Sequence, residues 1–274
     1  MSKILFIDID GTLYSMKKRT VPDSAIEAIH KARENGHKVY ICSGRSMAEI
    51  YPEILAIGFD GIIGGNGGYV EENGKAILHQ ALSEEETHHV IRWCEKNGLE
   101  LLLETNEGLF PSEGYPQVLY RIYRKLYGID PNYDKFVTEM IKGRDLYTVK
   151  NVNKISFLLE DWKYYEEAQK EFPDLFVGYW GGDAGRATNG DVTRKGVSKA
   201  NGIRYLLNYL HRDGKDAVAF GDEPADIPMF ELCGISVAMG NATEKTKEAA
   251  DYVTEDIDED GLYKAFDRLG LLQR

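Results

Sequence analysis

The sequence has fewer basic than acidic residues. It has 33 Lys and Arg against 45 Asp and Glu, so its formal net charge at pH 7 is −12. Proteins that bind nucleic acid gather Lys and Arg into stripes, and this sequence contains none. We therefore expect no nucleic-acid partner. An acidic protein that takes an anionic small molecule needs a local source of positive charge, which a metal ion can supply.

Cysteine is also scarce. The 274 residues include three, at Cys42, Cys94 and Cys233, far apart in the chain. An odd number at such spacing predicts neither a disulfide framework nor a zinc site. It is typical of small buried hydrophobic side chains in a reducing compartment.

Long apolar runs are missing as well. No stretch approaches the ~20 apolar residues that a membrane-spanning helix needs. The apolar run from Ile4 to Ile7 is interrupted by Asp8 and is too short for a signal peptide. We expect a cytoplasmic protein with no membrane partner. Its oligomeric state cannot be derived from the sequence.

Strand and helix patterns alternate at both ends of the chain, which predicts a parallel sheet covered by helices. Strands are expected at residues 4–9, 38–42, 61–64, 217–220, 235–238 and 252–253, and helices at about 23–35, 47–57, 199–210, 227–233 and 244–250.

The middle of the chain has a different pattern. Ser83 and Glu86 form a capping box for a helix that ends near Gly98. Further strands are expected at 100–104, 154–159, 175–180 and 185–193, and helical segments at 109–135 and 162–172. We therefore predict a discontinuous core formed by residues 1–82 and 191–274, with an α/β domain of residues 83–190 inserted into it.

The first motif that could carry chemistry is DIDGT, Asp8 to Thr12, at the end of an apolar strand. Acidic residues at such a place are costly unless something neutralises them, and a bound cation is the simplest partner. Side chains alternate along an extended chain, so Asp8 and Asp10 point to the same side. Gly11 permits the turn that leaves the strand. An ordinary loop of turn-forming residues is the alternative.

Three further motifs follow at strand ends or helix starts. Ser43 and Gly44 come after the strand 38–42, where a hydroxyl group and a glycine N–H can cradle a phosphate. Lys199 opens a helix and could hold a phosphate as a point charge, with Lys195 as the competing residue.

Asp222 and Asp226 form the fourth motif, after the strand 217–220. Carboxylates at a strand end suit Mg²⁺, which prefers oxygen ligands. Taken singly, these motifs could equally be a turn, a solvated lysine and a helix cap. Their joint occurrence in this order is the informative observation, because ligands of parallel sheets bind at the carboxyl ends of the strands.

In this combination the chain resembles the haloacid dehalogenase-like (HAD) hydrolase superfamily. Within that superfamily it resembles the Cof-type sugar phosphatases, which carry a large α/β (C2B-type) cap between the second and third motifs. The resemblance covers essentially the whole chain and is strongest at DIDGT, ICSGR, Asn66-Gly67-Gly68, GVSK, GDEPAD and VAMGNA. It implies a Rossmann-like parallel-sheet core with an inserted cap.

The resemblance also implies an activity, that of a magnesium-dependent phosphatase acting on small phosphate monoesters such as sugar phosphates. Asp8 would be the nucleophile that forms an aspartyl-phosphate. Asp10 would protonate the leaving oxygen and then deprotonate the attacking water.

The remaining roles are implied in the same way. Mg²⁺ would bind the Asp8 carboxylate, the Asp10 backbone carbonyl and the Asp222 carboxylate. The phosphoryl group would be held by Ser43, the Gly44 N–H and Lys199. Asp226 would support the metal through water or position Lys199.

One position departs from the family pattern. Ala225 stands where the family usually has Asn in the fourth motif, so we infer that a supporting hydrogen bond to the phosphate or to Lys199 has been lost. Two alternatives follow from this scaffold. One is a phosphate-binding or regulatory protein with weak catalysis, and the other is a phosphotransferase or phosphomutase.

The inserted domain should set substrate specificity. Asn189 and Arg194, near the return to the core, are candidates for contacting the polar end of the substrate. The insertion is also rich in aromatic residues, which are more often core residues than a surface for stacking on sugar rings. These are Phe110, Tyr115, Tyr120, Tyr123, Tyr127 and Tyr133.

Overall fold

The computed structural model describes residues 2–127, 139–182 and 184–273. The chain forms two compact units. The first consists of Met1–Arg45, Ile50–His79 and Ser198–Arg274, and the second of Ser46–Glu49 and Gln80–Val197.

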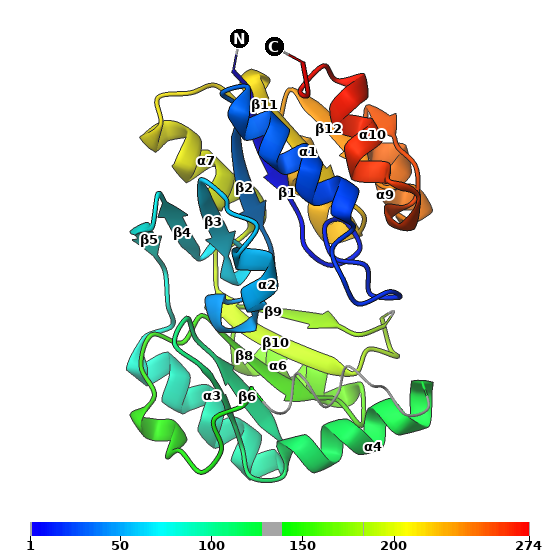
Figure 1. The fold of residues 1–274 in the computed structure, drawn as a ribbon. Coiled ribbons are helices and arrows are strands. Elements are labelled where there is room, and N and C mark those ends of the chain that lie inside the picture. The colour runs from blue at the N-terminus through cyan, green and yellow to red at the C-terminus, as the bar shows by residue number, and fades with distance from the viewer. Residues whose placement is uncertain (1, 128–138, 183, 274) are drawn as a thin grey trace. The chain divides into compact units, whose positions relative to one another are not determined.

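The first unit is built on a mostly parallel sheet (Figure 1). Within the described residues it has eight strands in the order β13-β12-β11-β1-β2-β3-β4-β5. Their bounds are β1 (Ile4–Ile7), β2 (Lys38–Cys42), β3 (Gly61–Gly64), β4 (Tyr69–Glu72), β5 (Lys75–His79), β11 (Ala217–Gly221), β12 (Ile235–Ala238) and β13 (Tyr252–Val253). All pairs from β13 to β3 are parallel, which confirms the predicted fold class.

The β4–β5 hairpin was not predicted from the sequence. It pairs antiparallel to β3 and closes that edge of the sheet. Its turn contains Asn73 and Gly74, both with positive φ, and Asn-Gly is a strong hairpin signal. Strand β5 is only partly buried, so the strands beside the turn show no clear alternation of apolar and polar residues. Without that alternation the sequence did not indicate a hairpin.

Helices cover both faces of this sheet. They are α1 (Asp23–Glu34), α2 (Pro52–Leu55), α7 (Lys199–Tyr209), α8 (Ile227–Phe230), α9 (Glu244–Ala249) and α10 (Gly261–Arg268). On one face α1 packs against α10, whose Phe266 ring lies 4.9 Å from that of Phe220 in β11. On the other, Ile203 and Leu206 of α7 pack on the strands.

The prediction of one helix over residues 47–57 is wrong. The chain instead forms a 3₁₀ turn, Met47–Glu49, and the short helix α2. Tyr51 between them is extended, with ψ of 140°, because a residue that precedes proline is disfavoured in the helical region. Pro52 then begins α2, where its fixed φ suits the first helical turn.

Where the second unit is described, it has a five-stranded antiparallel sheet in the order β7-β6-β8-β10-β9. Its elements are α3 (Glu84–Asn97), β6 (Leu101–Glu104), β7 (Leu109–Pro111), α4 (Tyr115–Tyr127), β8 (Lys154–Leu158), α6 (Lys163–Glu171), β9 (Leu175–Trp180) and β10 (Asn189–Arg194). The predicted capping box at the start of α3 is confirmed, since the Ser83 hydroxyl accepts from Glu86 N and the Glu86 carboxylate accepts from Ser83 N. Helices α3 and α6 pack on one sheet face, and α4 on the other.

The insertion was predicted to span residues 83–190, and the second compact unit contains Gln80–Val197. Strand β10 pairs with β9 from Asn189 to Arg194 and with β8 from Asn189 to Val192, so a boundary after residue 190 would cut a strand of the second sheet. The segment expected to be helical at 109–135 contains β7 and α4, and its last part, with Tyr133, lies outside the described residues. Tyr115 is a fully buried core residue.

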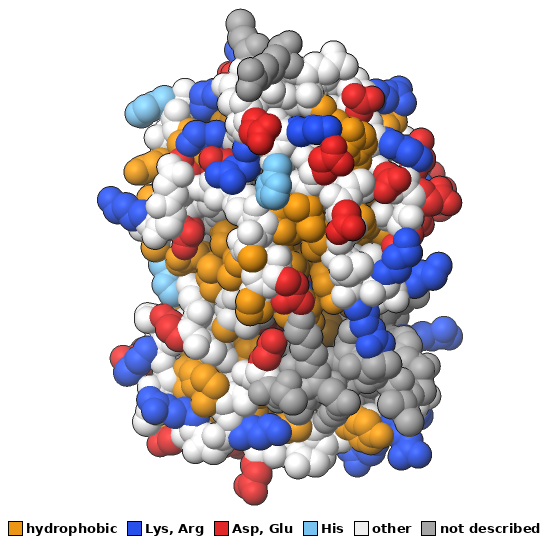
Figure 2. Space-filling view, in the orientation of Figure 1, with side chains coloured by type: hydrophobic (Ala, Val, Ile, Leu, Met, Phe, Trp, Pro, Cys, Tyr) orange, Lys and Arg blue, Asp and Glu red, His pale blue; other side chains and the backbone are white. Residues whose placement is uncertain are grey.

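The surface carries charges of both signs. Figure 2 shows acidic and basic side chains interspersed over the face drawn. Cys42 and Cys94 are buried, Cys233 is partly buried, and all three are free thiols. In the part of the chain that the structure describes, no helix is long and apolar enough to cross a membrane.

Candidate active site

The DIDGT segment turns sharply as it leaves β1. Asp8 extends the pairing with β11, because its N–H donates to Phe220 O at 3.1 Å. The turn closes when the N–H groups of Leu13 and Tyr14 donate to Ile9 O. Gly11 has φ of +83°, and a Cβ at this position would overlap the Asp222 carboxylate. The backbone therefore requires glycine here for its conformation and for the approach of the fourth motif.

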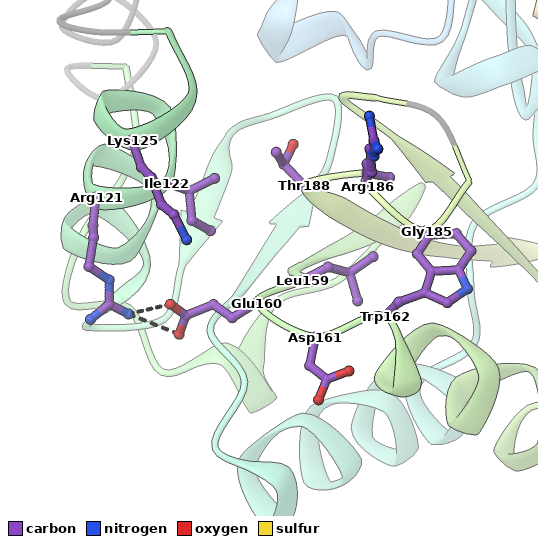
Figure 3. Close-up of a pocket in the computed structure, with 11 residues that line it drawn as sticks. Arg121, Ile122, Lys125, Leu159, Glu160, Asp161, Trp162, Gly185, Arg186 and Thr188 are labelled. Carbon is purple, nitrogen blue, oxygen red and sulfur yellow. Dashed lines mark hydrogen bonds and ion pairs between the residues drawn. The ribbon is translucent and has the colours of Figure 1, made fainter.

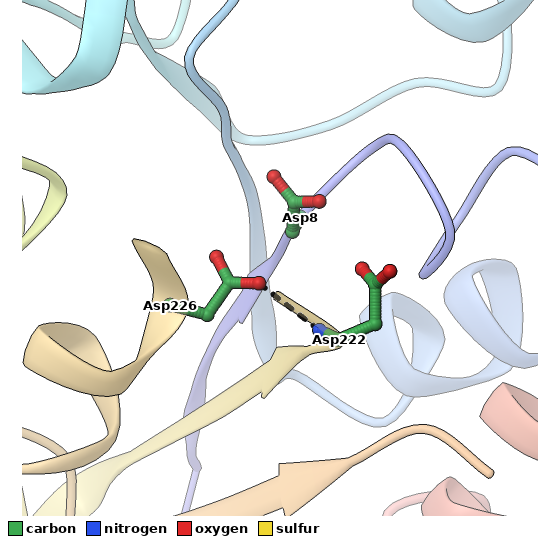
Figure 4. Close-up of side chains that lie close together, drawn as sticks. All are labelled: Asp8, Asp222 and Asp226. Atoms are coloured by element: carbon green, nitrogen blue, oxygen red, sulfur yellow. Dashed lines mark hydrogen bonds between the residues drawn. The ribbon is translucent and has the colours of Figure 1, made fainter. Parts of the chain in front are cut away.

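Three aspartates meet at the carboxyl ends of β1 and β11 (Figure 4). Asp8, Asp222 and Asp226 each offer a carboxylate oxygen, and these oxygens lie within 4.8 Å of one another. All three residues are buried. The parallel pairing of β1 with β11 brings the first and fourth motifs together across more than 200 residues of sequence.

Lys199 joins this cluster. Its Nζ lies 2.6 Å from Asp8 Oδ1 and 2.6 Å from Asp226 Oδ1. Lys199 is the first residue of α7. Gly67 packs directly against the backbone at the start of this helix, where a Cβ on Gly67 would overlap Ser198 O. The competing residue Lys195 is in the second unit and donates to Pro173 O instead. Lys199 therefore lies with the three aspartates and Lys195 does not, while the role of Lys199 in holding a phosphate stays a prediction.

The two carboxylates of the fourth motif differ in what they contact. Asp226 Oδ2 accepts from the N–H groups of Asp222 and Glu223 at 3.0 and 3.1 Å, and its Oδ1 accepts from Lys199. Asp222 Oδ1 accepts from the Thr12 hydroxyl at 2.8 Å. Within the described residues, Asp222 Oδ2 accepts no hydrogen bond. Asp222 is therefore better placed to bind a metal directly, and Asp226 to hold Lys199.

Burial and the closeness of the carboxylates to one another raise the pKa values of Asp8 and Asp222. Burial, opposed by Lys199, raises the pKa of Asp8 to about 7, with Asp226 and Asp10 adding to the rise. Burial and the nearby Asp8 and Asp226 raise the pKa of Asp222 to about 8. The pKa of Lys199 is raised well above its ordinary value by Asp226 and Asp8, against the effect of burial.

This donor set fits Mg²⁺. When ionised, the three carboxylates exceed the single positive charge of Lys199, so a divalent cation would relieve their repulsion. Hard carboxylate oxygens are the ligands that Mg²⁺ prefers, and it is commonly held by one or two of them together with water and phosphate oxygens.

The second motif reaches the same edge of the sheet. Strands β1 and β2 are parallel with Ile7 opposite Ile41, so Ser43 and Gly44 follow β2 just beyond the level of Asp8. Ser43 is buried, and its Oγ accepts from Arg45 N at 3.2 Å. A Cβ at Gly44 would meet no atom within 4 Å, so there is open space beside its backbone.

Asp10 does not join the buried cluster of aspartates. Its side chain is 40% exposed and is bound by the Arg45 guanidinium, with Nε to Oδ2 at 2.8 Å and Nη2 to Oδ1 at 2.6 Å. The family resemblance assigns the backbone carbonyl of Asp10, not its side chain, to Mg²⁺. The ion pair with Arg45 involves only the side chain, so binding of Mg²⁺ by the carbonyl stays a prediction.

Sequence reasoning gave no role to three residues that support the site. Thr12 binds Asp222, Arg45 binds Asp10, and Asn241 Nδ2 donates to Gly11 O at 2.8 Å. Each lies inside a stretch that carried the family resemblance, namely DIDGT, ICSGR and VAMGNA. The signal was therefore present, but the partner of each residue lies elsewhere in the sequence.

Ala225 is exposed on the 3₁₀ turn Pro224–Asp226. Lys199 keeps two carboxylate partners without an amide at this position. The hydrogen bond that we inferred to be lost is therefore not needed to hold Lys199.

Asn189 and Arg194 both lie in the second unit, on β10. Asn189 is fully buried, and Arg194 is exposed. They are five positions apart on one strand, so their side chains point to opposite faces of the sheet. The structure therefore does not bring these two residues together.

A separate pocket of about 390 Å³ lies in the second unit (Figure 3). It is lined by charged residues of both signs, and Arg121 binds both carboxylate oxygens of Glu160 there. Lys125, Trp162 and Arg186 also line it. It includes none of the residues that the sequence analysis selected.

Comparison with known proteins gives a consistent result. The candidate phosphatase YkrA of Bacillus subtilis (strain 168) is 31% identical over 274 residues, covering 99% of both chains. A phosphoglycolate phosphatase of Methanosarcina acetivorans is 29% identical, covering 97% of this chain and 96% of that protein. A solved HAD subclass IIB sugar phosphatase, BT4131, matches with a TM-score of 0.78 at 29% identity, covering 98% of this chain and 100% of that one.

The family profile described as haloacid dehalogenase-like hydrolase matches residues 5–266. This range contains all four motifs and the insertion between them. The match confirms the resemblance seen in the sequence, and the chain belongs to the haloacid dehalogenase-like hydrolase family.

Proposed function

We propose that this protein is a magnesium-dependent phosphatase that hydrolyses small phosphate monoesters through an aspartyl-phosphate on Asp8. The observation that carries the proposal is the position of Asp8, buried at a strand end with Lys199 Nζ 2.6 Å from its Oδ1 and Asp222 in the same cluster. A carboxylate that attacks an anionic phosphoryl group needs such positive charge beside it.

The reaction would run in two displacements. In the first, Asp8 Oδ attacks phosphorus, the bond from phosphorus to the leaving oxygen breaks, and Asp10 gives that oxygen a proton. In the second, water attacks the phosphoryl group, Asp10 takes the proton from water, and the bond to Asp8 breaks to release inorganic phosphate. Asp10 then holds a proton again for the next cycle.

Mg²⁺ would be held by Asp8, Asp222 and the Asp10 carbonyl, and when bound it neutralises charge on the transferring phosphoryl group. Ser43 and the Gly44 N–H, at the same sheet edge, would hold phosphoryl oxygens together with Lys199. Asp226 would hold Lys199 in place through its contact at 2.6 Å.

The substrate would be a small phosphorylated metabolite, with sugar phosphates as the leading class. The support comes from the relatives, which include a sugar phosphatase at 29% identity and a phosphoglycolate phosphatase at 29% identity. Those names describe different leaving groups, so the substrate has to be found by screening a panel of phosphorylated metabolites.

The test compares phosphate release from p-nitrophenyl phosphate and from sugar phosphates with Mg²⁺ and with EDTA. We expect turnover with Mg²⁺ only, and beryllium fluoride should label the wild-type protein at Asp8. Product analysis separates the alternatives. Release of free phosphate supports a hydrolase, whereas transfer to a sugar hydroxyl indicates a phosphotransferase or phosphomutase. Phosphate binding without turnover would contradict the proposal.

A further inference from the structure

The ion pair between Arg45 and Asp10 is the main contact of the first unit's site that the proposed mechanism leaves unused. The guanidinium binds both carboxylate oxygens of Asp10, at 2.6 and 2.8 Å. The Arg45 side chain is only 15% exposed, although Asp10 is 40% exposed. A bidentate arginine contact fixes the plane of a carboxylate as well as its position.

Arg45 is itself held in place on several sides. Its N–H donates to Ser43 Oγ at 3.2 Å, and its carbonyl accepts from Gly65 N at 2.7 Å. The guanidinium carbon lies 4.6 Å from the ring centroid of Tyr51, a cation–π contact. The Tyr51 ring in turn lies 5.5 Å from that of Tyr14.

These contacts connect two motifs. The turn that carries Ser43 also fixes Arg45, and Arg45 fixes the side chain of Asp10. Tyr14 belongs to the loop of the first motif, because its carbonyl accepts from Gly11 N at 3.0 Å. The orientation of Asp10 is thus set by the second motif rather than by its own loop alone.

We infer that Arg45 is a positioning residue that holds the Asp10 carboxyl in the orientation in which it serves the leaving group. The inference rests on the proposed function. A proton donor has to be within hydrogen-bond reach of the atom it protonates. Without Arg45 a half-exposed aspartate would turn freely about its side-chain bonds.

This role has a specific kinetic consequence. An alkyl phosphate has a poor leaving group that depends on proton donation, whereas p-nitrophenolate leaves readily without it. Loss of the orientation of Asp10 should therefore slow alkyl phosphates far more than p-nitrophenyl phosphate. General acid catalysis accelerates a reaction by about 10²–10⁴-fold. This range is the upper limit for the loss of rate on the alkyl phosphate. A residue that only maintains the fold would slow both substrates equally.

The experiment measures kcat/KM with Mg²⁺ for glycerol phosphate and p-nitrophenyl phosphate, in wild type, Arg45→Met and Arg45→Lys. We expect Arg45→Met to lower the ratio of the two values by about tenfold or more. Arg45→Lys keeps the positive charge but cannot bind both carboxylate oxygens as a guanidinium does, so it should give an intermediate ratio. The matched control is Arg33→Met, which removes another Arg–Asp pair of the first unit, with Arg33 Nε 3.1 Å from Asp60 Oδ2. It should leave the ratio unchanged.

A double variant tests whether Arg45 acts through Asp10. In an Asp10→Ala background, Arg45→Met should change the ratio no further. An equal loss on both substrates, or an additional change of the ratio in that background, would overturn the inference. If the wild type shows no magnesium-dependent turnover, the proposed function fails. If the wild type is active but the ratio does not move in Arg45→Met, only the role of Arg45 fails.

Discussion

Asp222→Asn should stabilise the metal-free protein while removing its response to Mg²⁺. The raised pKa of Asp222, about 8 against an ordinary 3.8, means that the folded protein keeps a proton that the unfolded chain has released. The contribution of Asp222 to the free energy of unfolding is therefore greatest below about pH 4 and is lost as the pH rises toward 8. Asparagine is neutral at every pH, and its Oδ1 can still accept from Thr12.

The size of the effect follows from the pKa difference. One pH unit is worth about 1.4 kcal/mol, so the interval from about pH 4 to pH 7 sets an upper limit of about 4 kcal/mol. Structural relaxation and water entry reduce this limit, and we expect a gain of about 1–3 kcal/mol. At about 2–4 °C per kcal/mol for a chain of this size, the unfolding temperature should rise by roughly 3–10 °C.

Magnesium should remove or reverse the difference in stability between the two proteins. At a concentration of about 100 times Kd, a ligand that binds only the folded state stabilises it by about 2.7 kcal/mol. Wild type should gain this stability, and Asp222→Asn should gain almost none.

Thermal unfolding at pH 7 with EDTA and with Mg²⁺ measures both effects. The control is Asp267→Asn, an exposed aspartate of α10 in the same unit. A lower unfolding temperature of Asp222→Asn in EDTA, or an equal magnesium response in both proteins, would refute the reasoning.

Four further predictions concern this site. Asp8→Asn should abolish turnover while leaving the fold intact, because an amide cannot form the aspartyl-phosphate, and near wild-type turnover would disprove the mechanism. Asp222→Ala should raise the magnesium Kd measured by calorimetry more than Asp226→Ala does, because Lys199 and two N–H groups already occupy the Asp226 oxygens. The reverse order would show that the ligands are misassigned. Magnesium affinity of the wild type should rise from pH 6 to pH 8, because Asp8 and Asp222, with pKa values of about 7 and 8, must lose protons to bind metal, and a flat profile would contradict this. Ala225→Asn should change kcat/KM for p-nitrophenyl phosphate by less than about threefold, since Lys199 is already held, and a tenfold gain would show that phosphate support had been lost.

Much of the fold could be predicted because short-range patterns carry it. The apolar run of β1, the helical spacing in α1 and the capping box of Ser83 and Glu86 each depend on residues within a few positions of one another. The failures also have local causes. Pro52 divides an apparent helix, and the β4–β5 hairpin has too little buried alternation to be recognised.

Sequence alone determined which residues could do chemistry. Acidic residues at the ends of buried strands need a neutralising partner, so Asp8 and Asp222 were identifiable from their type and position. The excess of acidic residues required that the positive charge for an anionic substrate be supplied locally. These conclusions need no knowledge of which strands are neighbours.

Tertiary structure decided which of those residues meet and what remains available to a ligand. Strand order places β11 beside β1, so Asp8 lies against Lys199, 191 positions away, and Thr12 binds Asp222, 210 positions away. Such pairings form only when the whole sheet forms, because no local pattern specifies them. Among the residues that the structure describes, both oxygens of Asp226 accept hydrogen bonds, whereas Oδ2 of Asp222 accepts none. Only the surroundings of these two identical side chains can make that distinction.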